Sequence, residues 1–473
     1  MDLNEASISR RNLLRGAAAA AILLPFGATL ASCAAPGGGN TGDKKPAGDV
    51  TADNPFGVAA NAKVDAVIFN GGYGIDYVEN SAKIMEGNKA LDGVTVKVSS
   101  STKIAQELQP RFVGGNPPDL IDNSGANSIG WNTILDQLEE LDEVLDADNL
   151  EGEKISDTLF GGVKDPGTFD GKFKALNYVM TVYGLWYSSS LFEANGWDLP
   201  KSWQDLKDLG AKAKEQGKFL FLWGKEAATY YQTLVIDSAV IQSGDDVRLP
   251  LENLDAKAWS HPTIQGILEI FYELIQAEYV KPGGAGTQFT QAQSQWSLDQ
   301  EALLYPSGSW IENEMKKQTA PDFKMMGIPE LPLDEKQTTP AGFMRAEAGE
   351  PFIVPSKAKN PEGGKELLRT MLSKEAATAF AKEKLAPTIV KGTVPADGFG
   401  STALVSQSKM LEAAGDNVFT IKSTNLYGMN SDQLPIWNSF LDGKMDVATL
   451  TTQLQALVDK VREDDSIKKI EIK

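Results

Sequence analysis

Two hydrophobic periods alternate along the first third of the chain after its N-terminal segment. Residues 64–70 form an apolar run typical of a buried strand, and 94–100 alternates apolar with polar side chains as a half-buried strand does. Residues 75–89 and the first half of 102–113 have helical spacing, and 120–122 is a third short apolar segment. The order strand, helix, strand, helix, strand predicts a parallel sheet covered by helices.

A second region of the same character begins near residue 184. Ser202 and Asp205 have the spacing of a capping box and predict a helix that ends at Gly217. Residues 218–224 are apolar and predict a buried strand, and helical patterns continue through 262–279. The apolar segment 236–243 fits either a helix or a strand. At 473 residues, the chain is long enough for two domains or one large two-lobed one.

The N-terminus has the layout of an export signal. Arg10 and Arg11 precede a nearly uncharged apolar run that reaches Leu30, and Cys33 follows in the string LASC. The paired arginines followed by two leucines favour the twin-arginine route, although paired arginines also occur in general secretion signals. LASC is typical of the processing site of a bacterial lipoprotein. Cleavage before Cys33 would leave that cysteine, the single one in the chain, as a lipidated N-terminus.

A lipid anchor at Cys33 explains the segment that follows it. Two acyl chains suffice for stable membrane attachment where one does not. Residues 34–58 are rich in Gly, Pro, Asn, Asp and Lys, and predict a flexible tether. The alternative is a transmembrane helix with a chance cysteine, but the run 16–32 is short for a span of about 20 residues. We therefore expect a protein anchored by lipid to the extracellular face of the membrane.

Charge and motif content narrow the function classes. A formal net charge of −19 without a polybasic run argues against nucleic acid and against binding to an anionic membrane surface. The single histidine, His261, precedes a proline and indicates a helix start, so no Ser-His or Cys-His nucleophile is expected. No zinc, phosphate-loop or other cofactor motif is present, so no metal and no cofactor are predicted. Paired carboxylates, as in a glycoside hydrolase, stay open as the enzymatic alternative.

Aromatic and small polar residues point to a neutral, polar ligand. Ligands of parallel sheets bind at the carboxyl ends of the strands, here at 71–76 and 122–124. Several of the nine tryptophans stand beside Gly, Ser or Asn, as Trp310 does after a Gly-containing turn. Sugars stack on such rings while their hydroxyls bond to polar side chains, although any single tryptophan is more often a core residue.

Long strings of the sequence resemble a known family. VDAVIFNGGYG, GGNPPDLIDNSGA, GLWYSSSLFEANGW and LLYPSGSWIENEM are similar to segments of extracellular solute-binding lipoproteins of carbohydrate ABC transporters. The similarity covers essentially the whole chain. RFVGGNPPDLIDNSGA and KPGGAGTQFT resemble the group in that family that binds N-acetylglucosamine or N,N′-diacetylchitobiose.

The resemblance implies an α/β fold of the periplasmic-binding-protein type. Two lobes, each a mainly parallel sheet flanked by helices, are expected on a hinge that the chain crosses three times, near 184–188, 352–355 and 387–391. The expected lobes are 59–184 with 353–388, and 185–352 with 389–473.

The implied function is the substrate-binding component of a carbohydrate importer. It is expected to be a monomer that is not an enzyme and that delivers its sugar to permease subunits. A surface-anchored chitooligosaccharide hydrolase is the alternative, and the choice between mono- and disaccharide stays open. No catalytic residue is predicted. The ligand-binding residues that the resemblance implies are Tyr73, Asp76, Asp122, Asn123, Ser124, Trp223, Trp310, Glu350, Tyr427 and Trp437.

Overall fold

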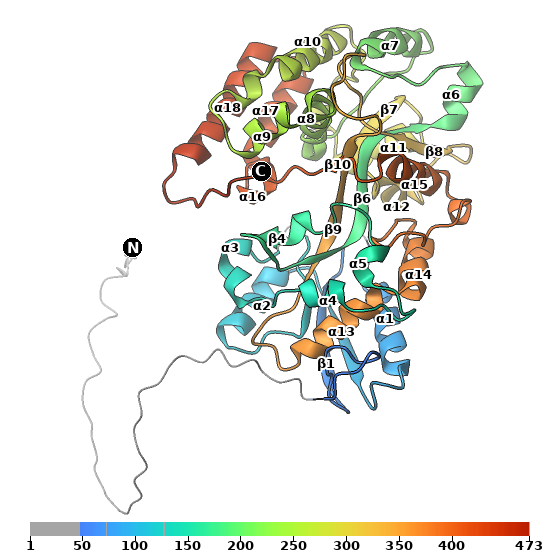
Figure 1. The fold of residues 1–473 in the computed structure, drawn as a ribbon. Coiled ribbons are helices and arrows are strands. Elements are labelled where there is room, and N and C mark those ends of the chain that lie inside the picture. The colour runs from blue at the N-terminus through green and yellow to red at the C-terminus, as the bar shows by residue number, and fades with distance from the viewer. Residues whose placement is uncertain (1–47, 72, 126–127, 473) are drawn as a thin grey trace, which may run out of the picture. The chain divides into compact units, whose positions relative to one another are not determined.

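Two long strands organise the fold of this chain (Figure 1). In the computed structural model, which describes residues 48–71, 73–125 and 128–472, β6 (Leu176–Ser188) and β9 (Met344–Ile353) pair antiparallel. Their pairing runs from Leu176 opposite Phe352 to Val182 opposite Ala346. The predicted signal peptide, Cys33 and most of the predicted tether lie outside the described residues.

The first three predicted strands are confirmed. β1 (Lys63–Phe69) pairs in parallel with β2 (Thr95–Ser101) on one side and β3 (Leu120–Asp122) on the other. β3 then pairs antiparallel with β9, so the strand order is β2-β1-β3-β9-β6-β7. The sheet ends with β7 (Leu304–Gly308), which pairs antiparallel with the far half of β6, as does β8 (Met325–Ile328). The sheet is therefore mixed, with parallel pairing in β2-β1-β3 and between β9 and the short β10 (Val418–Phe419).

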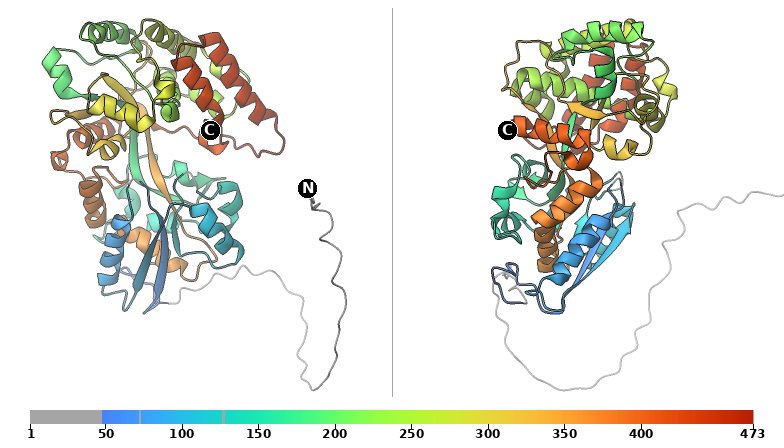
Figure 2. Two further views of the ribbon diagram at one scale, coloured as in Figure 1. Left: turned by 180° about the vertical axis from the view of Figure 1, so that it is seen from behind. Right: turned by 90° about the vertical axis from the view of Figure 1, so that its right-hand side faces the viewer.

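The helices form two groups at opposite ends of β6 and β9 (Figures 1 and 2). The group beside β1 comprises α1 (Asp76–Gly87), α2 (Ile104–Val113), α3 (Trp131–Ile134), α4 (Asp142–Asp146), α5 (Ile155–Thr158), α13 (Pro361–Met371) and α14 (Lys374–Lys384), with the hairpin of β4 (Thr168–Phe169) and β5 (Lys172–Phe173). The group beside β7 comprises α6 (Ser189–Asn195), α7 (Leu206–Glu215), α8 (Tyr230–Ser243), α9 (Asp245–Glu252), α10 (Pro262–Gln276), α11 (Phe289–Ser297), α12 (Ile311–Met315), α16 (Ser423–Leu426), α17 (Asn430–Leu441) and α18 (Val447–Glu463). Between the groups lie α15 (Thr402–Ala414) and β10 (Val418–Phe419), which pairs with β9.

Each helix group encloses its own hydrophobic core. The first core gathers buried side chains of β1, α1 and α13, and the second core gathers those of α7, α8, α10, α17 and α18. Along β6 the core changes between Val182, which belongs to the first, and Leu185, which belongs to the second. One face of β9 packs on the first core from Met344 onward. This strand therefore leaves the second core near its start, before the expected crossing at 352–355.

Several local expectations hold and others need correction. The helix start at His261 is confirmed, because its Nδ1 accepts a hydrogen bond from the Thr263 amide at the first turn of α10. The capping box of Ser202 and Asp205 is present, but it opens a 3₁₀ turn, and α7 follows and ends at Glu215. The ambiguous segment 236–243 is helical, as the end of α8.

Helix α2 reaches the end of the predicted segment at Val113 and is not limited to its first half. Pro110 lies inside the helix, where it removes a single backbone hydrogen bond. The buried face of Ile104, Leu108 and Phe112 spans both sides of the proline. Burial of that face therefore outweighs the lost bond.

The predicted tether ends earlier than residue 58. Phe56 and Val58 are buried in the first core, and the Asn54 side chain bonds to the backbone of Val58 in both directions. Arg369 of α13 also donates to the Ala52 carbonyl oxygen at 3.5 Å. Residues 48–58 of the predicted tether are therefore part of the folded body.

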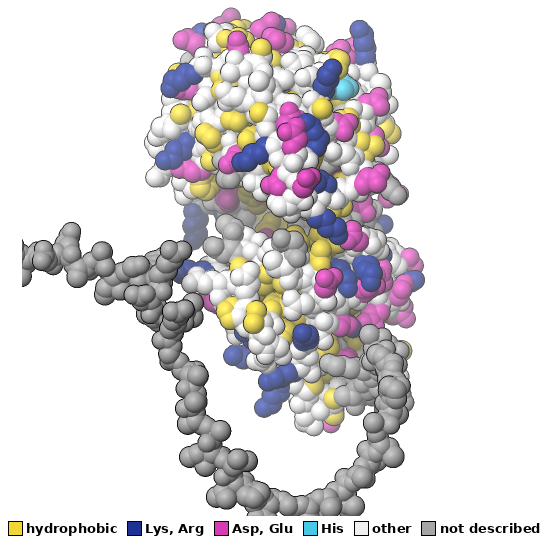
Figure 3. Space-filling view, turned by 90° about the vertical axis from the view of Figure 1, so that its left-hand side faces the viewer, with side chains coloured by type: hydrophobic (Ala, Val, Ile, Leu, Met, Phe, Trp, Pro, Cys, Tyr) yellow, Lys and Arg dark blue, Asp and Glu magenta, His cyan; other side chains and the backbone are white. Residues whose placement is uncertain are grey.

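The surface carries charges of both signs. On the face in Figure 3, acidic and basic side chains are interspersed over both ends of the molecule. Within the described ranges, no helix combines the length and the apolarity that crossing a membrane requires.

Candidate functional site

The carboxyl end of β3 forms a buried acidic cluster. Asp122 is fully buried, and its Oδ1 accepts a hydrogen bond from the Ser124 hydroxyl. Its second oxygen has no hydrogen-bond partner among the described residues. Burial, together with the charge of Glu350, raises the pKa of Asp122 well above its ordinary value. Buried polar atoms in folded proteins are nearly always hydrogen-bonded, so the second oxygen of Asp122 is suited to bind a polar group.

Glu350 lies next to this cluster on β9. Its φ of 56° is in the left-handed region, which costs a non-glycine residue about 1–2 kcal/mol. Burial raises the pKa of Glu350, and a hydrogen bond with Ser124 opposes that rise. Backbone strain of this kind is typical of functional sites. The carboxyl groups of Asp122 and Glu350 thus both lie near the Ser124 hydroxyl, where β3 and β9 meet.

Tyr73 comes from the loop after β1 and faces both parts of the molecule. Its ring packs on Phe380 of α14, with the centroids 5.4 Å apart. Burial raises the pKa of Tyr73, and the charges of Glu350 and of Glu314 in α12 add to the rise. Because Glu314 belongs to the helix group beside β7, the loop after β1 and helix α12 lie near each other across the middle of the molecule. Tyr73, Asp122, Ser124 and Glu350 thus form the first wall of the candidate site.

Trp310 forms the opposite wall, at the turn between β7 and α12. Its indole is half-buried and meets Tyr183 of β6 edge to face, with the centroids 5.6 Å apart, and Tyr230 of α8 at 6.1 Å. Gly308 makes this position possible, because a Cβ there would lie 1.9 Å from the Trp310 ring. Because the indole is only half-buried, part of its surface is exposed, which suits stacking on a sugar ring.

A charged network behind Trp310 fixes Tyr183. The Arg345 guanidinium lies over the Tyr183 ring, 4.0 Å from its centroid. Glu347 accepts a hydrogen bond from the Tyr183 hydroxyl at 2.8 Å and one from Arg345 Nη2 at 2.9 Å. Arg345 also pairs with the fully buried Asp237 of α8, at 3.5 Å. The network joins β6, β9 and α8 directly beneath the Trp310 wall.

Sequence reasoning did not identify Arg345, Glu347 or Asp237. The alternation of charged and small residues in MRAEAGE could have indicated that Arg345 and Glu347 share one face of a strand. Asp237, which lies in an apolar helix more than 100 residues away, carries no such sign.

The network borders a pocket of about 160 Å³. The pocket is lined by the first turns of α8, the end of β7 and the α16–α17 turn, and Trp310 and Tyr183 lie at it. Its polar lining residues include Glu330, Arg345, Ser307 and Gln232. Concave sites with apolar walls and a few polar groups are typical of small-ligand binding.

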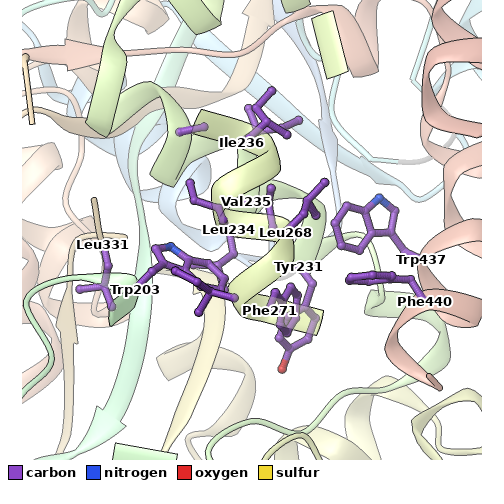
Figure 4. Close-up of a cluster of buried hydrophobic side chains, with 14 of the residues drawn as sticks. Trp203, Tyr231, Leu234, Val235, Ile236, Leu268, Phe271, Leu331, Trp437 and Phe440 are labelled. Carbon is purple, nitrogen blue, oxygen red and sulfur yellow. The ribbon is translucent and has the colours of Figure 1, made fainter. Parts of the chain in front are cut away.

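Two predicted ligand contacts belong to the second core instead. Trp437 is fully buried, donates from Nε1 to Gln232 Oε1 at 2.6 Å, and packs beside Phe440 in the core (Figure 4). Trp223 is 2 % exposed, and a Cβ on Gly284 would lie 2.3 Å from its ring. Neither indole presents a free face, so both are left out of the candidate site.

Three further predicted residues have their side chains engaged elsewhere. Asn123 bonds with both its amide atoms to the Ile129 backbone and closes the loop after β3. Asp76 accepts two hydrogen bonds from Lys384, at 2.7 and 2.8 Å. The Tyr427 hydroxyl accepts a hydrogen bond from the Ile470 amide. The structure brings together Tyr73, Asp122, Ser124 and Glu350 on one wall and Trp310 on the other.

Comparison with known proteins gives a consistent result. The family model described as "Bacterial extracellular solute-binding protein" matches residues 81–378. The "Diacetylchitobiose binding protein NgcE" of Streptomyces coelicolor is 57% identical over 473 residues, which is 100% of both chains.

Solved structures agree with this fold. The sugar-binding protein MalE from Xanthomonas citri has a TM-score of 0.66 at 16% identity, over 86% of this chain and 100% of that one. A "Chitin oligosaccharide binding protein" has a TM-score of 0.59 at 18% identity, over 82% of this chain and 95% of that one. At these sequence identities, the similarity to the two structures supports the fold only.

Proposed function

Because the chain belongs to the family of bacterial extracellular solute-binding proteins, we propose that it captures N,N′-diacetylchitobiose or N-acetylglucosamine and delivers it to an ABC importer. The ligand assignment rests on a relative of equal length, 57% identical, that is named as a diacetylchitobiose-binding protein. The proteins reported above are named as binding proteins and not as hydrolases. We therefore favour capture of the sugar without turnover over the hydrolase alternative.

The ligand is proposed to lie between the two walls of the candidate site. Trp310 offers a ring face to the sugar, while Asp122, Ser124 and Glu350 offer oxygens to its hydroxyls. β6 and β9 run between the two cores, so bending within these strands would bring the walls together around the sugar. The proposed lobes are those expected from the sequence, with the second crossing moved to the start of β9.

Attachment to the outer face of the membrane is proposed through lipid on Cys33. The string LASC after a signal-like segment supports the anchor, and the paired arginines Arg10 and Arg11 support export by the twin-arginine route. The protein is proposed to act as a monomer that meets its permease subunits at the membrane.

Titration of sugars against intrinsic tryptophan fluorescence, confirmed by calorimetry, tests the proposal. N-acetylglucosamine and N,N′-diacetylchitobiose should bind saturably and be recovered unchanged. Maltose and cellobiose should bind at least about tenfold more weakly, as a lost amide hydrogen bond predicts. Tight binding of maltose or cellobiose without binding of either acetamido sugar would remove the ligand assignment. Cleavage of the chitobiose would favour the hydrolase.

A further inference from the structure

The pocket behind Trp310 is lined by residues whose polar atoms lack a hydrogen-bond partner among the described residues. Ser307 Oγ, Glu330 Oε2 and Arg345 Nε are all buried, and no described residue forms a hydrogen bond with any of them. All three residues line the same pocket of about 160 Å³. Buried polar atoms in folded proteins are nearly always paired, so three such atoms around one cavity point to a missing polar partner.

These atoms offer both donors and acceptors. Arg345 Nε–H can only donate, and the Ser307 hydroxyl can donate or accept. Burial and the nearby charge of Asp237 raise the pKa of Glu330 well above its ordinary value, which favours the protonated carboxyl group. A protonated carboxyl group donates through its O–H and accepts through its other oxygen.

The same pocket has an apolar side. Leu234 and Ile236 of α8 and Ile421 before α16 are buried and line it. A single water molecule requires about 10–15 Å³ of such volume, so the pocket holds a group of several atoms. It thus combines an apolar niche, hydrogen-bond donors and an acceptor within one small volume.

We propose that this pocket receives an acetamido group of the sugar, with Glu330 and Ser307 as the residues that select it. The proposal rests on the proposed function. The amide N–H would donate to Ser307 Oγ, and the amide carbonyl would accept from Glu330 or Arg345. The methyl group would lie against Leu234, Ile236 or Ile421.

This arrangement explains discrimination and not only affinity. A sugar with a hydroxyl in place of the acetamido group is too short to fill the niche and leaves the buried atoms unpaired. A site built to hydrogen-bond one group rejects an analogue that lacks it more strongly than an apolar pocket rejects a missing methylene. Trp310, by contrast, would stack on either kind of sugar.

Variants of Glu330 and Ser307 in the full-length protein test the proposal. Affinities for N,N′-diacetylchitobiose are measured by calorimetry, and those for cellobiose by displacement at high concentration. Glu330→Met, which keeps the length of the side chain and removes its polar atoms, should lower chitobiose affinity about tenfold or more. Glu330→Gln should restore most of it, because a carboxamide also donates and accepts. Ser307→Ala should lower it about threefold or more, and cellobiose affinity should change less than about threefold in every variant.

Ser406→Ala is the matched control for Ser307→Ala. Ser406 is also buried, but its hydroxyl donates to the Ala403 carbonyl and accepts from the Gly327 amide, and it does not line the pocket. Both sugars should bind this control as they bind the wild type. Thermal melting of each variant shows that the protein is folded, and Ser307→Ala carries the test if Glu330→Met does not fold.

The possible outcomes separate this proposal from the one on which it rests. Unchanged chitobiose affinity in Glu330→Met and Ser307→Ala would show that the pocket holds only water, while the proposed function would stand. Equal losses for chitobiose and cellobiose would make these residues general sugar contacts and overturn the acetamido assignment. Failure of the wild type to bind any acetamido sugar would overturn the proposed function and this inference together.

Discussion

Replacing Trp310 with alanine removes the half-buried indole that forms the second wall of the candidate site. Truncation of a binding hot spot of this kind costs about 2–4 kcal/mol, so the affinity for N,N′-diacetylchitobiose should fall about 30- to 800-fold. The loss of stability should be smaller. The indole is half-buried and makes edge contacts with Tyr183 and Tyr230, each worth about 0.5–1.5 kcal/mol.

Trp437→Ala provides the matched contrast. That indole is fully buried and bonds to Gln232, so its truncation should destabilise the ligand-free protein by about 3–5 kcal/mol. Its folded fraction should lose much less affinity for the sugar than Trp310→Ala does. Both variants replace a tryptophan with alanine. Trp310→Ala should mainly lose sugar affinity, whereas Trp437→Ala should mainly lose stability.

Calorimetry with the disaccharide and thermal melting without it are the two measurements. A subtler variant, Gly308→Ala, keeps the indole but places a methyl group where the ring now lies, so it should also weaken binding. The reasoning is refuted if Trp310→Ala melts like Trp437→Ala and its folded fraction binds with wild-type affinity. Trp310 would then be a core residue.

Three further results are expected. Cys33→Ala should move the protein from the membrane fraction to the medium while sugar binding persists, and retention at the membrane would exclude the lipid anchor. Arg345→Met should lower the free energy of unfolding by about 3–5 kcal/mol in chemical denaturation, because the fully buried Asp237 and the half-buried Glu347 lose their cation; a stability equal to that of the wild type would contradict this. Burial raises the pKa of Glu312 to about 7, so between its usual 4.5 and 7 the folded protein keeps a proton that the unfolded chain releases, and stability falls as pH rises. The melting temperature of Glu312→Gln, relative to that of the wild type, should therefore rise from pH 5 to pH 8. A difference in melting temperature that stays constant with pH would contradict the raised pKa.

The periodic segments of the sequence were sufficient to predict the sheet around β1. Strands 64–70, 94–100 and 120–122 appear within one residue of their predicted bounds, because each carries its own hydrophobic pattern. The apolar segment 218–224 is the exception, since it is extended and buried but forms no ladder. Phe219 forms one isolated β-bridge with Ala302, and Phe221 forms another with Val280. A local pattern can predict an extended buried segment, but not whether its neighbours continue alongside it.

The tryptophans show where prediction from sequence stops. Trp310 and Trp437 both stand beside small polar residues, yet one indole is half-buried at the candidate site and the other is sealed in the second core. What seals Trp437 is Gln232, about 200 positions earlier in the chain, and what covers the Trp223 ring is Gly284, about 60 positions later. The feature that positions Trp310 is local, because Gly308, two residues before it, leaves the space that the Trp310 ring occupies. A sequence can therefore indicate that a local turn leaves room for an aromatic side chain near the surface. It does not reveal that a distant segment buries another aromatic side chain.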